Sequence, residues 1–344
     1  MTLRTVGGTA LPELPSLQPA GSSAPASLGE RAFLASALSV LSRRRGWLGA
    51  AAVAATALSM GYVSLQTQQR KWIFQSAHSR PSTRDARLET AHDHGMESVW
   101  IEHGSASSGR RIRLHALWAP NDDPAVPVLL FLHGARRDVV NSAFRIERMR
   151  EMGFSVLAVD YRGFGDSTDE LPSEAGVVED ASAAWRWLGA LQPNRPRYLY
   201  GHSLGGAIAV QLAALLATGP ASEQPKGVIL ESTFTSIGDM FGTFKWGWLP
   251  ISLLISQRFD SLAAVPRVKA PLLIVHGSND ALVPARFGEA LFEKATAAKR
   301  FLLVDGASHS DTSFRGARQY RAALHELFGI GTPIDAGMGT GAGQ

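Results

Sequence analysis

The feature that most constrains the fold of this chain is a regular alternation of short apolar runs with helix-like stretches, which begins near Met96. Such apolar runs are typical of strands buried on both faces of a parallel sheet. They are Val126–His133, Phe154–Asp160, Arg197–Tyr200, Gly227–Glu231, Pro271–His276 and Arg300–Val304. The helix-like stretches are Val139–Met152, Glu174–Leu191, Leu204–Ala217, Ala285–Ala298 and Thr312–Phe328. Repeated strand–helix units predict one α/β domain with a mostly parallel sheet and helices on both faces.

Two kinds of segment depart from this pattern. Ser98–His103 and Arg111–Trp118 alternate polar and apolar side chains, which indicates half-exposed antiparallel strands. Phe234–Gln257 lies between two predicted strands and gathers large apolar side chains, among them Met240 and Trp246. It is too aromatic for a simple connection, although ordinary core packing would also account for the cluster.

The N-terminal part is predicted to stand apart from the sheet. Residues 1–46 form a leader that begins rich in Pro, Ser, Gly and Ala, and such a composition predicts disorder. The uncharged run over residues 47–65 approaches the length that crosses a bilayer as a helix, so we predict a single-pass membrane anchor there. A cleaved signal peptide and an amphipathic surface helix are the alternatives. The triplet Arg43–Arg45 favours a cytoplasmic N-terminus and an extracytoplasmic main domain, but the flanking charges are nearly balanced.

The main domain is predicted over residues 70–330, followed by a flexible Gly-rich tail over 331–344. The net charge of +4 is concentrated near the N-terminus, and no basic helix with interleaved aromatic residues is present, so no nucleic-acid partner is predicted. The sequence contains no cysteine, which excludes disulfides, cysteine-ligated metals and a thiol nucleophile.

Gly201-His202-Ser203-Leu204-Gly205 matches the pattern G-x-S-x-G. In a chain with 34 glycines such a match says little by itself, so its context must decide. The run Arg197–Tyr200 leads into it and a Gly-rich helix start follows, as in a sharp strand-to-helix turn. Such a turn presents the Ser203 hydroxyl above the carboxyl ends of the strands, beside a positive helix N-terminus. The alternative is a helix start in which Ser203 only caps the helix.

A serine hydroxyl becomes a strong nucleophile only when a base takes its proton, and that base needs an orienting acid. Asp280 lies just past one buried strand, and His309 lies just past the next. We therefore predict Ser203 as the nucleophile, His309 as the base and Asp280 as the acid. Glu231, at the end of another strand, is the rival to Asp280.

The negative oxygen that forms when a serine attacks a carbonyl needs two backbone N–H donors. Leu204, directly after the nucleophile, is predicted to supply one. The loop after the strand that ends at His133 is predicted to supply the other, through Ala135 and with Arg136 as a further donor. A plain strand-ending turn is the alternative for this loop.

Taken together, these motifs resemble the α/β-hydrolase family, and more narrowly its serine-aminopeptidase-like and membrane-anchored branch, which includes depalmitoylating thioesterases. The matching segments are Phe131–Gly134, Asp160–Ser167, Gly201–Gly206, Glu231–Ser232, Phe259–Ser261, His276–Pro284 and Gly306–His309. The resemblance covers the chain from about Arg70 to Phe328. It implies the α/β-hydrolase fold, in which the triad runs in the order Ser, Asp, His. It also implies a small cap over residues 234–257, after the sixth strand.

The chain departs from the family pattern at one place. Close relatives often carry Asn after the first His-Gly, whereas Ala135-Arg136-Arg137 stand here. Against that family pattern, this chain is expected to have a more basic pocket mouth.

These features predict a serine hydrolase that cleaves carboxylic esters or thioesters through an acyl-enzyme, with no metal or cofactor. A small-molecule or lipid-like acyl substrate is expected. The candidate pocket residues are Arg136, Tyr161, Phe234, Met240 and Trp246. One alternative is a serine-aminopeptidase-like peptide-bond hydrolase, and another is a non-catalytic, membrane-anchored scaffold on the same fold. The sequence does not indicate the oligomeric state.

Overall fold

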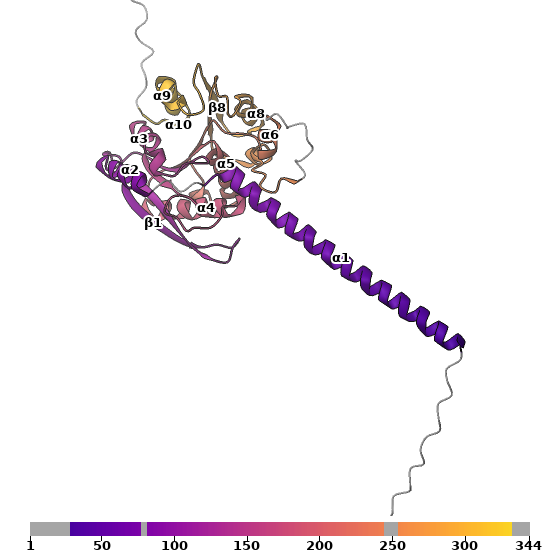
Figure 1. The fold of residues 1–344 in the computed structure, drawn as a ribbon. Coiled ribbons are helices and arrows are strands. Elements are labelled where there is room, and N and C mark those ends of the chain that lie inside the picture. The colour runs from indigo at the N-terminus through magenta and orange to yellow at the C-terminus, as the bar shows by residue number, and fades with distance from the viewer. Residues whose placement is uncertain (1–27, 77–80, 244–253, 332–344) are drawn as a thin grey trace, which may run out of the picture. The chain divides into compact units, whose positions relative to one another are not determined.

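The computed structural model describes residues 28–76, 81–243 and 254–331 (Figure 1). The chain divides into two units, Met1–Val63 and Ser64–Gln344, and the strands all belong to the second. The strands are β1 (Glu97–Gly104), β2 (Arg111–Ala119), β3 (Val128–Leu132), β4 (Ser155–Val159), β5 (Arg197–His202), β6 (Gly227–Glu231), β7 (Leu272–Gly277) and β8 (Lys299–Val304).

Within the described residues these strands form one sheet in the order β1-β2-β4-β3-β5-β6-β7-β8. β2 pairs antiparallel with β1 and with β4, and the pairs from β4 to β8 are parallel. The two runs with alternating side chains thus form the antiparallel edge, and the wholly apolar runs form the parallel part. The predicted α/β-hydrolase fold is confirmed. Because these strands are parallel, β3, β5, β6, β7 and β8 end at a common edge of the sheet, where the candidate site residues follow them.

Helices cover both faces of this sheet (Figure 1). The α-helices are α1 (Leu28–Phe74), α2 (Pro81–Asp93), α3 (Ala143–Glu151), α4 (Glu174–Leu191), α5 (Leu204–Leu216), α6 (Ile237–Gly242), α7 (Ser261–Ala264), α8 (Arg286–Lys294), α9 (Thr312–Arg315) and α10 (Ala317–Phe328). Short 3₁₀ turns among the described residues include η1 (Val140–Ser142), η2 (Ala221–Glu223) and η4 (Val265–Arg267). The helices predicted from the sequence are confirmed, with α9 and α10 dividing the last one.

The core has two parts, because successive strand residues point to opposite faces of the sheet. On one face Leu130 and Leu132 of β3 join the cluster that α4 and α5 cover. On the other face Leu129 and Phe131 join the cluster that α3 and α10 cover. Each such side chain contributes about 1.5–3 kcal/mol through burial, which explains why β3 is apolar at every position.

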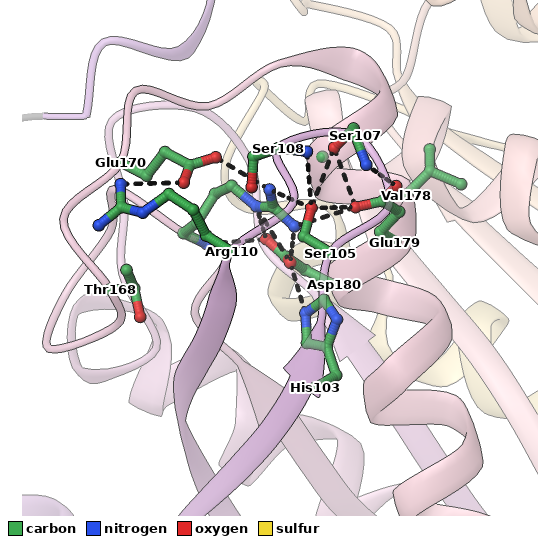
Figure 2. A network of polar contacts seen from close by, with 12 residues as sticks. His103, Ser105, Ser107, Ser108, Arg110, Thr168, Glu170, Val178, Glu179 and Asp180 are labelled. Atoms are coloured by element: carbon green, nitrogen blue, oxygen red, sulfur yellow. Dashed lines mark hydrogen bonds and ion pairs between the residues drawn. The ribbon is translucent and has the colours of Figure 1, made fainter. Parts of the chain in front are cut away.

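A buried polar network fastens the antiparallel edge to α4 (Figure 2). Arg162, which follows β4, donates from Nη2 to Asp180 of α4 at 2.7 Å and from Nη1 to Glu170 at 3.0 Å. His103 of β1 lies with its Nε2 2.9 Å from Oδ1 of the same Asp180. Glu179 adds an ion pair to Arg162 at 3.3 Å. Since Arg162 and Asp180 are almost wholly buried, this network holds the loop after β4 against the β1–β2 hairpin.

The prediction of a single-pass membrane anchor over residues 47–65 is wrong. In the portions of the chain that the structure describes, no helix is long and apolar enough to cross a membrane. The stretch is helical within α1, but most of its side chains are Ala, Gly, Ser and Thr. These side chains are too short or too polar to supply the transfer energy that insertion requires. The predicted attachment to a membrane and the predicted extracytoplasmic position of the main domain depended on this anchor, so they lose their basis.

Some predictions concern residues outside the described ranges. They include residues 332–344 of the predicted tail, residues 1–27 of the leader, and Trp246. Helix α1 begins at Leu28, within the segment for which the sequence predicts disorder. Of the predicted cap, the structure describes residues 234–243, which include α6, and residues 254–257. The predicted domain boundaries stay predictions.

Gly205 allows a first test of the fold. A β-carbon at this position would overlap the carbonyl oxygen of Leu132 on β3, so Gly205→Ala must force α5 away from the sheet. We expect a loss of about 3 kcal/mol or more in the free energy of unfolding, since overpacking against rigid backbone has no cheap relief. Urea unfolding followed by circular dichroism would measure it.

Gly242→Ala is the matched control, because a β-carbon at Gly242 in α6 would meet open space. A helical Gly-to-Ala change there should be neutral or stabilising. Equal stability of the two variants would contradict the close contact of α5 with β3.

Candidate active site

Ser203 occupies a strained turn between β5 and α5. Its φ of 54° and ψ of −120° are rare for a residue with a side chain and cost about 1–3 kcal/mol. Two strong backbone contacts hold it: the Ser203 N–H donates to the carbonyl of Glu231 at 2.9 Å, and its carbonyl accepts from Thr233 Oγ1 at 2.8 Å. The Ser203 side chain makes no capping hydrogen bond to α5 and instead lines a cavity, so the helix-cap alternative is excluded.

Asp280 and His309 come together at the ends of β7 and β8. The Nδ1 atom of His309 lies 2.8 Å from Oδ2 of Asp280. The other oxygen of Asp280 accepts from the backbone N–H groups of Leu282 at 3.0 Å and Val283 at 2.8 Å. Burial by itself would raise the pKa of Asp280, but hydrogen bonds from His276 and His309 outweigh it and hold that pKa below its ordinary value. An ionised Asp280 therefore orients the His309 ring so that its Nδ1 carries the proton.

Glu231, the rival acid, has a different role. Its fully buried carboxylate accepts from Arg145 Nη1 at 2.7 Å, from Thr312 Oγ1 at 2.5 Å and from Tyr200 Oη at 3.0 Å. Tyr320 adds a fourth, longer bond at 3.3 Å. These four donors occupy both carboxylate oxygens, so Glu231 is a structural anion under the site and does not orient His309.

Two buried side chains fix the backbone that carries His309. Arg145 Nη2 donates to the carbonyl of Ser310 at 2.8 Å. His202 Nε2 lies 2.9 Å from the carbonyl of His309. Burial, with the nearby charge of Arg145, lowers the pKa of His202 well below its ordinary value. His202 is therefore neutral, and its Nε2–H donates to that carbonyl.

The predicted oxyanion donors lie beside Ser203. Leu204 is the first residue of α5, so its N–H belongs to the first turn, whose donors have no acceptor in their own helix. Ala135 follows Gly134, where a β-carbon would come within 3.2 Å of the Ser203 β-carbon. The N–H of Arg136 already donates to the carbonyl of Phe74 at 3.2 Å. That bond leaves Ala135 as the better candidate in this loop.

Ser203, His309, Leu204 and Ala135 line one cavity of about 1050 Å³. Of the candidate pocket residues, Arg136, Phe234 and Met240 also line it. Tyr161 does not: it is fully buried, and its hydroxyl donates to the carbonyl of His133 at 3.2 Å, so it supports the end of β3.

Several lining residues were not predicted from the sequence: Trp72, Ile73, Gln75, Arg137, Ile237, Phe241 and Leu282. Trp72 and Ile73 lie in the last turn of α1, and Ile73 belongs to the core of the main unit. The apolar run Trp72–Phe74, after a Gln- and Arg-containing segment, is the signal that could have revealed them. In the described part of the chain, no group of three or more His, Cys, Asp or Glu side chains could hold a metal ion.

Comparisons with known proteins agree with the fold and the motifs. A family profile described as serine aminopeptidase, S33, matches residues 123–263. An uncharacterized protein of Mycobacterium tuberculosis is 31% identical over 287 residues, which cover 80% of this chain and 92% of that protein. The lysophosphatidylserine lipase ABHD12 of Gallus gallus is 30% identical over 259 residues, which cover 69% of this chain and 62% of the lipase. Among solved structures, the esterase Pf2001 of Pyrococcus furiosus is similar in fold, with a TM-score of 0.55, 18% identity and coverage of 73% of this chain and 96% of that chain.

The Glu231 cluster predicts a measurable contribution to stability. Glu231→Gln leaves Arg145 buried without a negative partner, which should lower the free energy of unfolding by about 3 kcal/mol. Glu102→Gln, which removes an exposed ion pair with Arg111, should cost less than about 1 kcal/mol. Chemical denaturation of both variants measures the difference, and similar losses would contradict the assigned role of Glu231.

The lowered pKa of Asp280 predicts how the stability of the fold depends on pH. Its folded-state pKa lies below the unfolded value of about 3.9, so it stabilises the fold above that pH and loses this effect as the pH falls. Native protein should therefore lose more stability between about pH 5 and pH 3 than Asp280→Asn does. Urea unfolding at both pH values tests this. The exposed control Asp122→Asn should keep the native pH dependence, and a native-like dependence in Asp280→Asn would refute the prediction.

Proposed function

We propose that this chain, which belongs to the α/β-hydrolase family, is a serine hydrolase that cleaves carboxylic esters or thioesters. The observation that carries the proposal is that Ser203 and His309 line one cavity and that His309 is paired with Asp280. Ser203 lies in a strained turn there, and His309 lines the same cavity while its Nδ1 pairs with Asp280 at 2.8 Å.

In the proposed mechanism Ser203 Oγ attacks the substrate carbonyl while Nε2 of His309 takes the hydroxyl proton. Asp280 accepts the hydrogen bond that His309 donates from Nδ1–H, and its negative charge stabilises the positive ring that forms. The N–H groups of Leu204 and Ala135 bind the negative oxygen of the tetrahedral intermediate. The intermediate collapses to an acyl-Ser203, and His309 gives its proton to the departing alcohol or thiol. Water then attacks the acyl-enzyme by the same steps and releases the acid.

The charge of the cavity favours an ester over a peptide. An aminopeptidase needs negative groups to hold the protonated amine of its substrate. No Asp or Glu is among the described residues that line the cavity, whereas Arg136 and Arg137 are. These cations would repel such an amine, so the peptide-bond alternative loses support.

The apolar lining of the cavity and the names of the relatives favour an ester whose acyl group is apolar. Trp72, Ile73, Ile237, Met240 and Phe241 give the cavity an apolar side. The similar ABHD12 proteins carry names that describe lipases, which supports an acyl substrate here. A non-catalytic scaffold is the alternative from another class, and it would not require the Asp280–His309 pair.

A fluorophosphonate probe should label native protein at Ser203 and stop ester hydrolysis. Ser203→Ala should abolish labelling and lower kcat by about 10⁴-fold or more, because the remaining groups cannot replace the nucleophile. Gel fluorescence and a p-nitrophenyl ester assay measure the two effects.

Ser310→Ala is the control, since Ser310 lines the same cavity but its side chain has no proposed role. This variant should keep both labelling and hydrolysis. Native protein that resists the probe and cleaves no ester would favour the scaffold.

A further inference from the structure

The loop after β3 contains a short contact between a buried side chain and the backbone beside the nucleophile. Nδ1 of His133 lies 2.8 Å from the carbonyl oxygen of Gly134, the next residue in the chain. Because a carbonyl oxygen only accepts hydrogen bonds, Nδ1 of His133 carries a proton and donates it. His133 is only 1% exposed, so water does not compete for this hydrogen bond.

The surroundings of His133 hold its ring in this orientation. Nε2, on the far side of the ring, faces Oδ1 of Asp160 at 3.4 Å, which is too long for a strong hydrogen bond. The rings of Tyr161 and Phe164 pack against the imidazole, with centroids 4.5 Å and 5.0 Å away. Turning the ring by half a rotation would place a carbon against each of the two oxygens. The contacts therefore keep Nδ1 towards Gly134.

The bond to Gly134 also fixes the direction of the next N–H group. The carbonyl of Gly134 and the N–H of Ala135 belong to one peptide unit, which is trans. In a planar trans unit the C=O and the N–H point in opposite directions. Since the C=O is bound by the buried ring of His133, the Ala135 N–H points away from that ring. Gly134 and Ala135 line the cavity together with Ser203, so the cavity is where this N–H can meet an acceptor.

The Ala135 N–H is free to bind a substrate oxygen. Among the backbone hydrogen bonds of the described residues, none uses this N–H, whereas the N–H of Arg136 donates to Phe74. A glycine has wide backbone freedom, so without the His133 bond the Gly134–Ala135 peptide unit is free to turn over. Its carbonyl oxygen would then face the cavity and repel the negative oxygen of the tetrahedral intermediate.

The same hydrogen bond strengthens the donor that it orients. Hydrogen bonds in a chain polarise one another, so a peptide unit that accepts at its C=O donates better from its N–H. A donor that is already in place also needs no reorientation while charge develops on the substrate oxygen. Both effects act on the transition state and leave the binding of the neutral ester unchanged.

We propose that His133 is a positioning residue for the oxyanion site. Its Nδ1–H holds the Gly134–Ala135 peptide unit so that the Ala135 N–H is directed to the oxygen that forms beside Ser203. His133 does not touch the substrate and acts only through Ala135. This inference rests on the proposed serine-hydrolase function and adds the group that orients one of its two oxyanion donors.

Two substitutions separate Nδ1 from the rest of the ring. The side-chain amide nitrogen of Asn reaches about as far as Nδ1 of histidine, and that of Gln about as far as Nε2. Both amides are donors. His133→Asn therefore keeps a donor for the carbonyl of Gly134, whereas His133→Gln moves the donor towards Asp160. Both variants lose the ring that packs on Tyr161 and Phe164, so lost packing alone lowers Tm in both.

The assays are hydrolysis of p-nitrophenyl butyrate and inhibition by hexyl trifluoromethyl ketone, which a serine attacks to form a negative hemiketal oxygen. His133→Gln should lower kcat/KM about tenfold or more and weaken the ketone by a similar factor. This loss is smaller than the roughly 10²–10³-fold effect of removing an oxyanion donor, because the Ala135 N–H remains. His133→Asn should keep both quantities within about threefold of native protein. The alcohol formed by reducing the ketone cannot be attacked and should bind all three proteins alike.

His94→Gln is the matched control, because His94 lies on the exposed surface and should leave every quantity unchanged. Equal losses of kcat/KM in His133→Asn and His133→Gln would make His133 structural and overturn its positioning role. An unchanged affinity of His133→Gln for the ketone, or an equal loss of affinity for the alcohol, would overturn it as well.

Native protein provides a second test, which decides the matter if His133→Gln does not fold. NMR of protein labelled at its histidine nitrogens should show a proton on Nδ1 of His133. The resonance of that proton should shift when the trifluoromethyl ketone binds and stay in place when the alcohol binds. An Nδ1 without a proton, or a resonance that the ketone does not shift, would refute the proposal.

Failure of the positioning role and failure of the proposed function give different results. If native protein is labelled at Ser203 and cleaves the ester, but His133→Gln has native kinetics, only the positioning role is refuted. If the fluorophosphonate does not label Ser203 and the ester is not cleaved, the proposed function fails and the role of His133 fails with it.

Discussion

The whole site depends on one close contact, the packing of the β5–α5 turn against the neighbouring end of β3. Ser203 can hold its positive φ only because Gly205 lets the helix approach the carbonyl of Leu132. Gly134 lies in the loop after β3 and also packs close to the serine. A β-carbon added at Gly134 would lie 3.2 Å from the Ser203 β-carbon. A β-carbon at Gly205 would overlap the backbone of β3 and push α5 away from it, whereas one at Gly134 would require a shift of a few tenths of an ångström. The strain at Ser203 is thus maintained by the sheet and is not a local property of the turn.

Two buried carboxylates at neighbouring strand ends illustrate how environment decides role. Glu231 is the last residue of β6 and Asp280 follows β7, and these two strands end at the same edge of the sheet. The oxygens of Glu231 are fully used by Arg145, Thr312, Tyr200 and Tyr320. Asp280 keeps one oxygen for His309, because its other oxygen is held by two backbone amides. Glu231 therefore holds Arg145, which binds the backbone next to His309, and Asp280 orients the His309 ring.

The cavity combines an apolar wall with a cationic one. Trp72 and Ile73 come from the end of α1, Ile237 from α6, and the arginines from the loop after β3. These elements are far apart in the sequence, so no single segment supplies both the apolar and the cationic residues of the cavity. The polarity of the pocket thus arises from the tertiary arrangement.

The sequence by itself determined the mostly parallel sheet and the succession of strands and helices along the chain, and it predicted Ser203, His309 and Asp280 as the candidate triad, with Glu231 as a rival acid. It could do so because apolar periodicity, G-x-S-x-G and strand-end Asp and His are local patterns, and parallel strands must end at one edge. The same local reasoning failed for residues 47–65, where length suggested a membrane anchor but the side chains are too small and polar for one. It also placed Tyr161 in the pocket, whereas the structure buries it against His133. The choice between Glu231 and Asp280 and the use of the Arg136 amide were decided only by the tertiary structure. Each depends on which distant groups come within hydrogen-bonding reach, and no single segment of the sequence contains that information.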